Sequence, residues 1–398
     1  MGTINIAIQA SSTSWTGGKD ICMNFIDGHP VIYWTIKNVL DNIEGAFVTI
    51  VAPEFDKDGD FNALVDEFNG ERVRLSFSYN DSPLDRLIGC HEKLQENDFI
   101  IRVDGLNYAF DAKAMKEMLS QARAGNFDMV KYPDDFPIHF TFDVYKIGAL
   151  RKLKQLLTAD DGIYQIHPKY YMMMHPESFA TKYFQPAQVY SNELLSKYRN
   201  SYKNVFAARQ GGIKHRISAG DQLNFHYEIA ATYADNKMEV LDIASGEGYG
   251  SVILAGKAKA VIGSDYDKET IERANVLHAE VKNLKFSVEN ALNSSFEDGR
   301  FDLIASMETI EHVPSEDAFM LEMKRILKPG GRLIFSTPQN SMGHIPMNNE
   351  HMKEYSLDEV INLAKKYFTI EKVIGIKQGR IIIPDSPKGT NTMVVCKK

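Results

Sequence analysis

The sequence has few cysteines and no long apolar run. Only Cys22, Cys90 and Cys396 occur in 398 residues, and they are widely separated. This spacing provides neither a disulfide framework nor a zinc knuckle, and it is typical of a reducing compartment, so we expect a cytoplasmic protein. No apolar stretch reaches the roughly 18 residues of a membrane span, and no basic segment precedes an apolar one at the N-terminus, so neither a transmembrane helix nor a signal peptide is predicted.

An excess of positive charge is also missing. Lys and Arg total 45 against 53 Asp and Glu, which gives a net charge of -8. This balance argues against nucleic acid or an anionic membrane as a partner. Hydrophobic residues make up 44% of the chain and charged residues 25%, the balance of a globular protein. The length suits two or three domains.

Two parts of the chain alternate between strand-like and helical patterns. We predict strands over 4–10, 47–53, 73–78 and 98–105 in the first part, and over 239–245, 260–266, 284–290, 301–308 and 331–338 in the second. Such alternation indicates α/β domains with doubly wound parallel sheets and helices on both faces. We therefore expect two domains, at residues 1–185 and 224–398, joined by a mainly helical linker over 186–223.

The run VLDIASGEGYG, from Val240 to Gly250, is a strand that reaches an acid and then a glycine-rich loop. A dinucleotide pyrophosphate favours G-x-G-x-x-G, but here the spacing is G-x-G-x-G and Asp242 would repel a pyrophosphate. A carboxylate there suits a ligand with a cationic end. Asp265, at the end of the next strand, can accept the hydroxyls of a ribose. S-adenosylmethionine combines these features. Alternatively, the glycines only make a tight turn and Asp265 only caps a helix.

From about residue 224 onward, five stretches follow one another in a recognisable order: VLDIASGEGYG, VIGSDYDKETIERA, FSVENALNSSFED, FDLIASMETIEHV and LKPGGRLIFSTP. In this order they resemble class I S-adenosylmethionine-dependent methyltransferases, especially those of polysaccharide and ubiquinone biosynthesis. The resemblance implies a cofactor site formed by Asp242, Ala244, Gly246, Gly248, Asp265, Tyr266, Asn290, Ala291 and Met307.

By this resemblance Asp242, Gly246 and Gly248 surround the methionine part of the cofactor. Asp265 then binds the ribose, and Asn290 with Ala291 contacts the adenine. Two residues depart from the family pattern. Ala244 replaces a usual Gly, and Asn290 replaces a usual Asp but keeps a hydrogen-bond acceptor for the adenine amino group.

The stretch SMETIEHV places Glu308, Glu311 and His312 at the end of the fourth strand, beside the expected sulfonium. A hydroxyl nucleophile must be aligned with the methyl–sulfur bond and must lose its proton, and His312 is the first candidate for the general base. Alternatively, Glu308, Glu311, His312 and His351 ligate a divalent metal such as Mg²⁺, which would lower the pKa of a coordinated hydroxyl. E-x-x-E-H here resembles both ubiquinone-pathway O-methyltransferases and metal-dependent RNA-end methyltransferases. A third possibility is that Glu311 and His312 only brace a loop.

The polar segment QNSMGHIPMNNEHMKEYS is expected to form a loop over the acceptor, followed by a helix with Ser356 as its N-cap. Its NNEHMKEYS part resembles methyltransferases found with polysaccharide biosynthesis enzymes, as does the upstream NFHYEIA. We therefore predict that His226, Tyr227 and His351 line the acceptor or cofactor pocket. Alternatively, His226 and Tyr227 are an ordinary pair on a helix surface.

In the first domain, the loop QASSTSWTGGKD could cradle phosphates with its backbone N–H groups and Lys19. Over about residues 3–185 the chain resembles cytidylyltransferases of the spore-coat polysaccharide and acylneuraminate type. The resemblance implies a nucleotide site with Gln9, Lys19, Arg102 and Asp104, and pairing into a homodimer. Leu106 follows Gly105 where the family has a metal-binding Asp, and Tyr145 replaces an acid. A domain that binds a nucleotide-linked sugar, or only a scaffold, is therefore favoured over an active enzyme.

Together these features predict methylation of a sugar hydroxyl, or an amine, on a nucleotide-activated or surface-glycan precursor. One alternative is a bifunctional enzyme that also activates a sugar with CTP. The other is a non-catalytic protein of binding and assembly.

Overall fold

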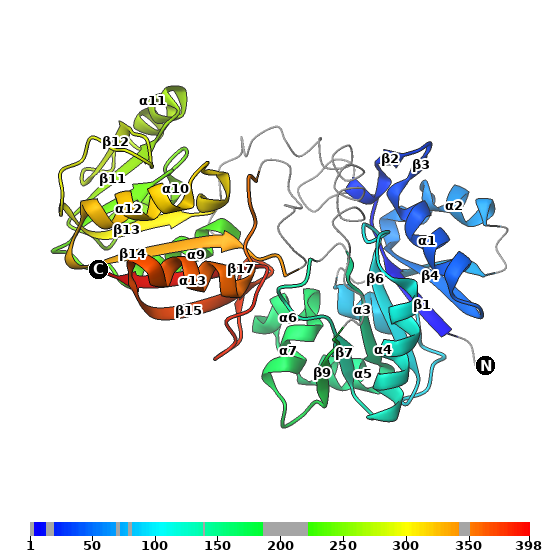
Figure 1. Cartoon of the computed structure of the whole chain (residues 1–398). Helices are drawn as coiled ribbons and strands as arrows, with labels where there is room; N and C mark the ends of the chain where they lie inside the picture. The colour runs from blue at the N-terminus through cyan, green and yellow to red at the C-terminus, as the bar shows by residue number, and fades with distance from the viewer. Residues whose placement is uncertain are drawn as a thin grey trace. The chain divides into compact units, whose positions relative to one another are not determined.

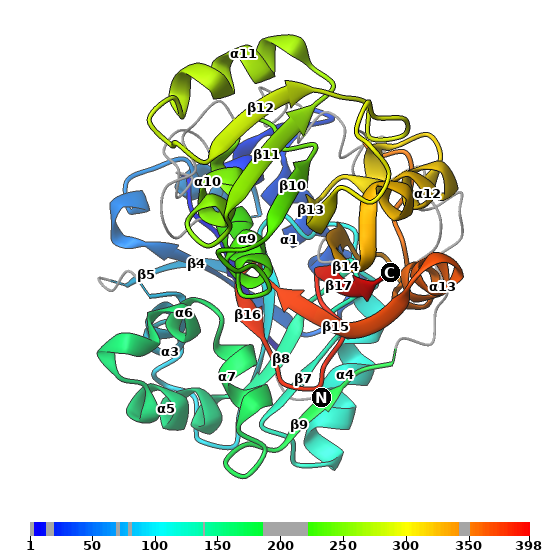
Figure 2. The ribbon, with the colours of Figure 1, turned by 90° about the vertical axis from the view of Figure 1, so that its left-hand side faces the viewer.

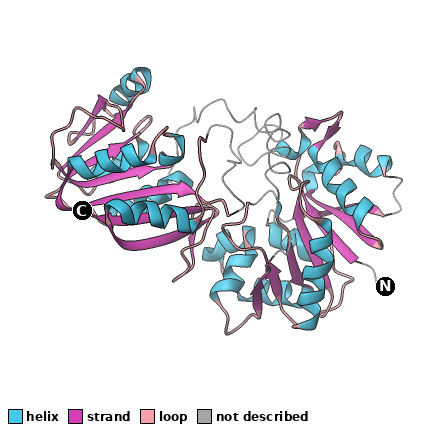
Figure 3. Ribbon diagram, in the orientation of Figure 1, coloured by secondary structure: helices cyan, strands magenta, loops and turns pink. Residues whose placement is uncertain are grey.

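The computed structural model describes residues 4–12, 20–68, 72–78, 82–137, 140–185, 222–341 and 351–398. The chain divides into two compact units, Met1–Gln210 and Gly211–Lys398 (Figure 1). In each unit helices accompany a central sheet (Figure 3), which confirms the predicted α/β class. The predicted linker lies outside the described residues as far as residue 221.

The sheet of the first unit has the strand order β5-β4-β1-β6-β8-β7-β9. Its core strands β5, β4, β1 and β6 are parallel, whereas β8 runs antiparallel to β6 and β7. The strands are β1 (Ile4–Gln9), β4 (Ala46–Pro53), β5 (Val73–Ser78), β6 (Phe99–Asp104), β7 (Met129–Lys131), β8 (Asp143–Lys146) and β9 (Thr181–Tyr183), and a small hairpin joins β2 (Phe25–Ile26) to β3 (His29–Pro30). The helices are α1 (Val31–Asn42), α2 (Phe61–Glu67), α3 (Pro83–Gly89), α4 (Ala112–Ala124), α5 (Ile147–Leu156), α6 (Gly162–Ile166) and α7 (Pro168–Met174).

The sheet of the second unit has the order β12-β11-β10-β13-β14-β17-β15-β16. The strands from β12 to β14 are parallel, and β17, β15 and β16 extend the sheet in antiparallel fashion. The strands are β10 (Glu239–Ile243), β11 (Ala260–Asp265), β12 (Leu284–Val288), β13 (Phe301–Met307), β14 (Leu327–Pro338), β15 (Thr369–Lys377), β16 (Ile381–Ile382) and β17 (Asn391–Lys397). The helices are α9 (Gln222–Ala231), α10 (Tyr249–Ala255), α11 (Lys268–Leu277), α12 (Glu316–Ile326) and α13 (Leu357–Tyr367).

Both faces of this sheet are buried. Leu241 packs into a cluster with Phe319 of α12 and Leu363 of α13, whereas its neighbour Val240 packs into a second cluster with Leu254 of α10. This division follows from strand geometry, because successive side chains point to opposite faces. Figure 2 shows α9 and α10 on one side of the strands, with α12 and α13 on the other.

Local signals also set where the helices begin. Ser356 caps α13 and forms a capping box with Glu359, as predicted for this serine. Within the described part of the chain, none of the helices combines the length and the apolar character that crossing a bilayer requires.

The strand order creates a switch point at β10, which pairs with β11 on one side and β13 on the other, all three parallel. Their carboxyl ends therefore meet at one edge of the sheet, which is where open α/β sheets bind ligands. In the first unit β1 occupies the equivalent place between β4 and β6.

Candidate functional site

The loop after β10 turns through residues in the left-handed region. Ala244 has φ 59°, Gly246 φ 54° and Gly248 φ 83°. A side chain at Gly246 would meet no atom within 4 Å, so the backbone is exposed to open space there. A Cβ at Gly248 would lie 2.3 Å from the ring of Phe286, and one at Gly250 would lie 2.1 Å from the ring of Tyr227. Gly248 and Gly250 are thus required for packing, whereas Gly246 leaves room for a ligand.

Asp242 lies beneath this loop and is fully buried. Tyr227 donates a hydrogen bond to Oδ1 at 3.1 Å, and Ser251 donates one to Oδ2 at 2.6 Å. Burial raises the pKa of Asp242 to about 7, although both hydrogen bonds oppose the shift. Neither Asp242 nor Tyr227 lines the cavity described next. The predicted contact of Asp242 with the methionine part of the cofactor, and the predicted place of Tyr227 in the pocket, therefore stay predictions.

A cavity of about 590 Å³ opens at the carboxyl ends of the strands. Its described walls are Ala244, Asp265, Tyr266, Glu289, Asn290, Ala291, Leu292, Glu308, Thr309, His312, Val313 and Pro314. The structure thus gathers seven of the predicted site residues around one space, although they come from four separate strand ends. Met307 is instead buried in the core of the unit.

The side of the cavity formed by β11 and β12 carries the groups predicted to bind the adenosine. Asp265 accepts hydrogen bonds from the backbone N–H groups of Gly246 at 3.1 Å and Asp267 at 3.0 Å, which fixes its carboxylate at the strand end. The next residue, Tyr266, is 82% exposed, so its ring is available to a ligand. Asn290 accepts a hydrogen bond from the N–H of Leu292 at 2.9 Å.

The side formed by β13 carries Glu308 in a polar network. Glu308 has φ 52°, a strained conformation for a residue other than Gly. Ser336 donates to its Oε1 at 2.7 Å, and Asn391 donates to its Oε2 at 2.6 Å. The buried His226 reaches the same network through a 3.0 Å contact between its Nδ1 and Oγ of Ser336. Burial lowers the pKa of His226, while the nearby Glu308 acts in the opposite direction. His226 is therefore a buried network residue rather than one of a helix-surface pair.

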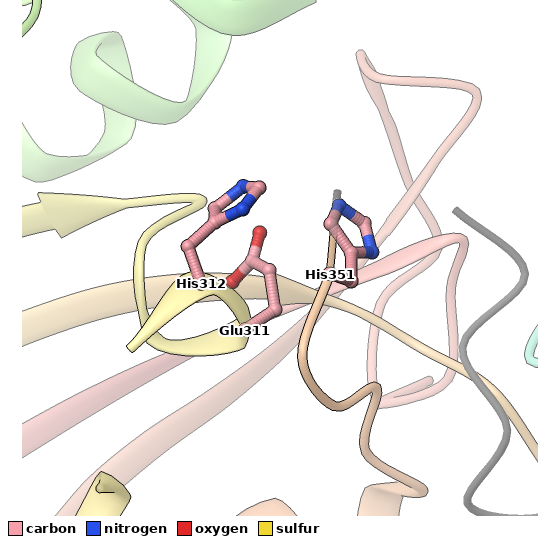
Figure 4. Close-up of side chains that lie close together, drawn as sticks. All are labelled: Glu311, His312 and His351. Atoms are coloured by element: carbon pink, nitrogen blue, oxygen red, sulfur yellow. The ribbon is translucent and has the colours of Figure 1, made fainter. Parts of the chain in front are cut away.

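Glu311, His312 and His351 form a second group, with one potential ligand atom from each residue lying within 4.8 Å of the others (Figure 4). Glu311 is fully buried and accepts from Thr337 at 3.0 Å through Oε2. Burial, followed by the charge of Glu308, raises the pKa of Glu311 well above its usual value. The rings of His312 and His351 lie edge to face with centroids 4.9 Å apart. The structure does not bring Glu308, predicted as a fourth ligand, into this group, because Ser336 and Asn391 hold its two oxygens.

A carboxylate also orients His351. Its Nδ1 lies 2.7 Å from Oε1 of Glu354, and Asn340 donates to Oε2 of Glu354 at 2.9 Å. The N–H of Met352 donates to the carbonyl oxygen of Glu311 at 2.8 Å, so the segment that carries His351 is attached to the segment that carries Glu311.

Several hydrogen-bond partners of Glu308 and Glu311 were not predicted from the sequence. Ser336 and Thr337 lie in the predicted strand FSTP, but a strand pattern does not show that their hydroxyls contact carboxylates. Asn391 reaches Glu308 only because β17 pairs with β14, in a register that sets Asn391 opposite Pro338. Nothing in the local sequence around residue 391 indicates this pairing.

In the first unit, the predicted residues Gln9, Arg102 and Asp104 also meet at strand ends. Arg102 donates to Gln9 at 2.8 Å through Nε and to Asp104 at 3.2 Å through Nη2. Nearby, Lys169 donates to Asp143 at 3.4 Å. Lys19 and the rest of the predicted phosphate loop from residue 13 lie outside the described residues.

Comparison with known proteins finds a family match within the second unit. Residues 234–381 match a family model described as a methyltransferase domain. The chain is 31% identical over 146 residues to a "Probable S-adenosylmethionine-dependent methyltransferase" of Mycolicibacterium smegmatis, covering 35% of this chain and 56% of that protein. It is 41% identical over 103 residues to the chloroplastic tocopherol O-methyltransferase of Arabidopsis thaliana, covering 25% and 30%. It is 35% identical over 117 residues to a ubiquinone biosynthesis O-methyltransferase of Cereibacter sphaeroides, covering 28% and 46%.

The chain thus spans only 30% to 56% of the length of these relatives. The residues that the family model matches include the glycine loop, the described walls of the cavity and the acidic strand end. The C-terminal part of the chain is a class I S-adenosylmethionine-dependent methyltransferase domain.

Proposed function

We propose that the protein transfers the methyl group of S-adenosylmethionine to a hydroxyl group of a sugar, in a nucleotide-activated or surface-glycan precursor. The observation that carries this proposal is the composition of one cavity. Groups suited to an adenosine line it at β11 and β12, and groups suited to a proton acceptor line it at β13.

The cofactor would enter with its ribose on Asp265. The carboxylate of Asp265 is already aligned by two backbone N–H groups, and it can accept the ribose hydroxyls without rearrangement. The adenine would lie near Asn290 and Ala291, with the exposed ring of Tyr266 beside it. The open backbone at Gly246 supports close approach of the remaining part of the cofactor.

In the transfer, a bond forms between the acceptor oxygen and the methyl carbon while the carbon–sulfur bond breaks. The electron pair of that bond goes to sulfur, which becomes neutral, and the acceptor proton goes to a base. His312 and Glu308 both line the cavity and are the candidates for that base. Glu308 is held by Ser336 and Asn391, so its carboxylate is in a fixed position.

The charge of the walls supports an acceptor group that carries no phosphate. Among the described residues that line the cavity there are three carboxylates and no Lys or Arg. Residues 342–350, MGHIPMNNE in sequence, contain no Lys or Arg either. A negative phosphate would be repelled here, whereas a neutral hydroxyl or a cationic amine would not. The diphosphate of a nucleotide-linked sugar would have to lie away from this wall.

Two relatives favour oxygen over nitrogen as the methylated atom, because both are named as O-methyltransferases. For the first unit, we propose recognition of the nucleotide-linked sugar by the group around Arg102 and Lys169, which bond carboxylates near the strand ends. The resemblance of residues 3–185 to cytidylyltransferases of the acylneuraminate type supports a homodimer, which light scattering of the purified protein would test.

The test begins with calorimetry of the purified full chain with S-adenosylmethionine. We expect one binding site per chain, and an absence of binding would leave only the assembly role. Candidate sugars and nucleotide-linked sugars are then incubated with methyl-labelled cofactor, and transfer of label to a sugar oxygen is expected. A parallel incubation with CTP, Mg²⁺ and sugars tests the bifunctional alternative, for which release of pyrophosphate would be required.

A further inference from the structure

Both carboxylate oxygens of Glu308 are held by the protein, and the side chain still lines the cavity. Ser336 donates to Oε1 at 2.7 Å, and Asn391 donates to Oε2 at 2.6 Å. The backbone N–H of Glu308 also donates to the carbonyl oxygen of Ser336, at 3.1 Å. A carboxylate has about four lone-pair sites, so each oxygen can accept one further hydrogen bond. Because the side chain of Glu308 stays 19% exposed in the cavity wall, this remaining capacity is available to a ligand.

His226 lies behind this carboxylate and does not line the described cavity wall. Its side chain is only 2% exposed. The Nδ1 of His226 lies 3.0 Å from Oγ of Ser336 and 3.6 Å from Oε1 of Glu308. The longer of these distances exceeds that of a hydrogen bond. His226 therefore reaches Glu308 through the hydroxyl of Ser336.

The number of hydrogens sets the direction of this chain of hydrogen bonds. Ser336 has a single hydroxyl hydrogen and gives it to Glu308, because a carboxylate can only accept. Oγ of Ser336 then accepts from His226, so the hydrogen of the imidazole must be on Nδ1. Burial lowers the pKa of His226, against the charge of Glu308, and so favours the neutral ring, which carries one N–H. A protonated Nδ1 cannot accept a proton through Ser336, so this chain does not make His226 a proton acceptor.

We infer that His226 is a positioning residue for methyl transfer, which donates from Nδ1 to Ser336 and thereby holds the carboxylate of Glu308 aligned with the acceptor hydroxyl. This inference rests on the proposed function. The acceptor hydroxyl would donate to a free lone pair of Glu308, which would orient the acceptor oxygen toward the methyl carbon. His226 would touch neither acceptor nor cofactor. The place in the pocket predicted for His226 from the sequence is thus replaced by a role behind the pocket wall.

The first experiment determines the tautomer of His226 without measuring activity. The full-length protein is labelled with ¹⁵N-histidine, and NMR distinguishes ring nitrogens that carry hydrogen from those that do not. His226→Asn identifies the signal by its loss. The buried His91 is an internal reference, because its Nδ1 lies 2.8 Å from the carbonyl oxygen of Leu87, which can only accept. We expect Nδ1 of His226 to be protonated as in His91, and hydrogen on Nε2 alone would overturn the inference.

The second experiment tests the role by single-turnover methyl transfer. His226→Leu removes the donor and should slow transfer about 10- to 100-fold, because a hydrogen bond in a chain that ends on a charged group is lost. Calorimetry should find cofactor affinity little changed. His226→Asn keeps an N–H at the position of Nδ1 and should restore the rate, whereas the amide of His226→Gln lies one carbon farther and should not. If His226 only filled space, the order would be reversed, because Leu and Gln are closer to His in size than Asn is.

Matched serine variants test whether His226 acts through Ser336. Ser336→Ala should slow transfer at least as much as His226→Leu, and combining the two should add little, since residues of one network are not additive. Ser306→Ala is the control, because the buried Ser306 hydroxyl on β13 has no hydrogen-bond partner within the described residues. Additive losses in the double variant would contradict the chain.

The two experiments separate this inference from the proposed function. If the wild-type protein transfers methyl groups but His226 carries its hydrogen on Nε2, or Asn fails to restore the rate, only the positioning role fails. If Nδ1 of His226 is protonated but the protein does not bind S-adenosylmethionine, the proposed function fails and the positioning role fails with it, whereas the hydrogen-bond chain stands.

Discussion

The two units place polar groups at the same position in similar sheets, but the groups differ in how they are neutralised. In the first unit, at the ends of β1 and β6, Arg102 bonds both Gln9 and Asp104. On the neighbouring strand β8, Asp143 is paired with Lys169. Opposite charges thus compensate one another within the protein.

In the second unit, at the ends of β10, β11 and β13, carboxylates gather without a cation on the described cavity wall. One carboxylate oxygen is buried and unpaired, and Ala244 and Glu308 adopt strained backbone conformations. Such features cost stability, and they persist where a ligand or a reaction requires them. Both sheets gather polar groups at their strand ends, whereas the described cavity wall of the second unit carries carboxylates without Lys or Arg, an environment that favours a cationic ligand.

The largest effect that would sharpen this contrast is expected from His312→Ala. Because His312 lines the cavity and is the first candidate for the proposed base, methyl transfer should fall about 10²- to 10⁴-fold. Affinity for S-adenosylmethionine should stay within threefold, since the groups proposed to bind the cofactor lie at the ends of β11 and β12. Single-turnover transfer of labelled methyl measures the rate, and calorimetry measures the cofactor affinity. The control is His175→Ala, which removes an exposed histidine of the first unit. Equal loss of rate and cofactor affinity would contradict the assignment.

The next effect concerns the pH dependence of stability. Burial raises the pKa of Asp242 to about 7, so the folded state holds this proton more tightly than the unfolded chain does. The stabilisation is therefore fully present below about pH 4 and is lost as pH rises toward 7, by at most about 4 kcal/mol. Asp242→Asn should remove this dependence, since an amide does not titrate.

Both Trp residues, Trp15 and Trp34, lie in the first unit, so fluorescence does not report on Asp242. The buried thiol of Cys396 does, because its labelling requires opening of the second unit. Wild type and Asp242→Asn are compared at each pH, which cancels the ionisation of the thiol. Parallel curves for the two proteins would show that folding does not raise the pKa of Asp242.

Local patterns were sufficient to predict much of the second site. Asp265 ends β11, Glu308 follows β13 directly, and Asn290 lies two residues beyond β12. Parallel strands bring their carboxyl ends together, so the convergence of these residues on one cavity follows from the sequence. The α/β class of the fold follows from the alternation of strand-like and helical patterns along the chain.

Long-range pairing was not predictable in this way. The strand β17 pairs with β14 in the antiparallel direction, and only this register brings Asn391 to Glu308. Glycine also has two uses that look alike in a sequence. Gly246 leaves open space, whereas Gly248 admits the ring of Phe286, and only the packed structure distinguishes them.

A moderate effect would test the contrast directly through matched substitutions. Asp265→Asn removes a charge that accepts two backbone N–H groups beside the proposed ribose. We expect affinity for S-adenosylmethionine to fall about 10- to 100-fold, because hydrogen bonds to charged groups contribute about 1.5–3 kcal/mol. Asp104→Asn makes the same chemical change at a strand end of the first unit and should not alter that affinity. Calorimetry measures both, and a similar loss in the two variants would break the comparison.

The smallest effect concerns strain in the glycine loop. Ala244 has φ 59°, a conformation that costs an L-residue about 1–2 kcal/mol and a glycine almost nothing. Ala244→Gly should relieve this strain, but a glycine also loses about 0.4–1 kcal/mol through the greater freedom of the unfolded chain. A net stabilisation of less than about 1 kcal/mol is expected, measured by slower labelling of Cys396. Asn126→Gly, at φ 49° in the first unit, is the control, followed by the fluorescence of Trp34 in the same unit, and it should gain less because asparagine tolerates the left-handed region. If Ala244→Gly were instead the less stable protein, the loop would not be storing backbone strain, and the difference between the two strand ends would rest on charge alone.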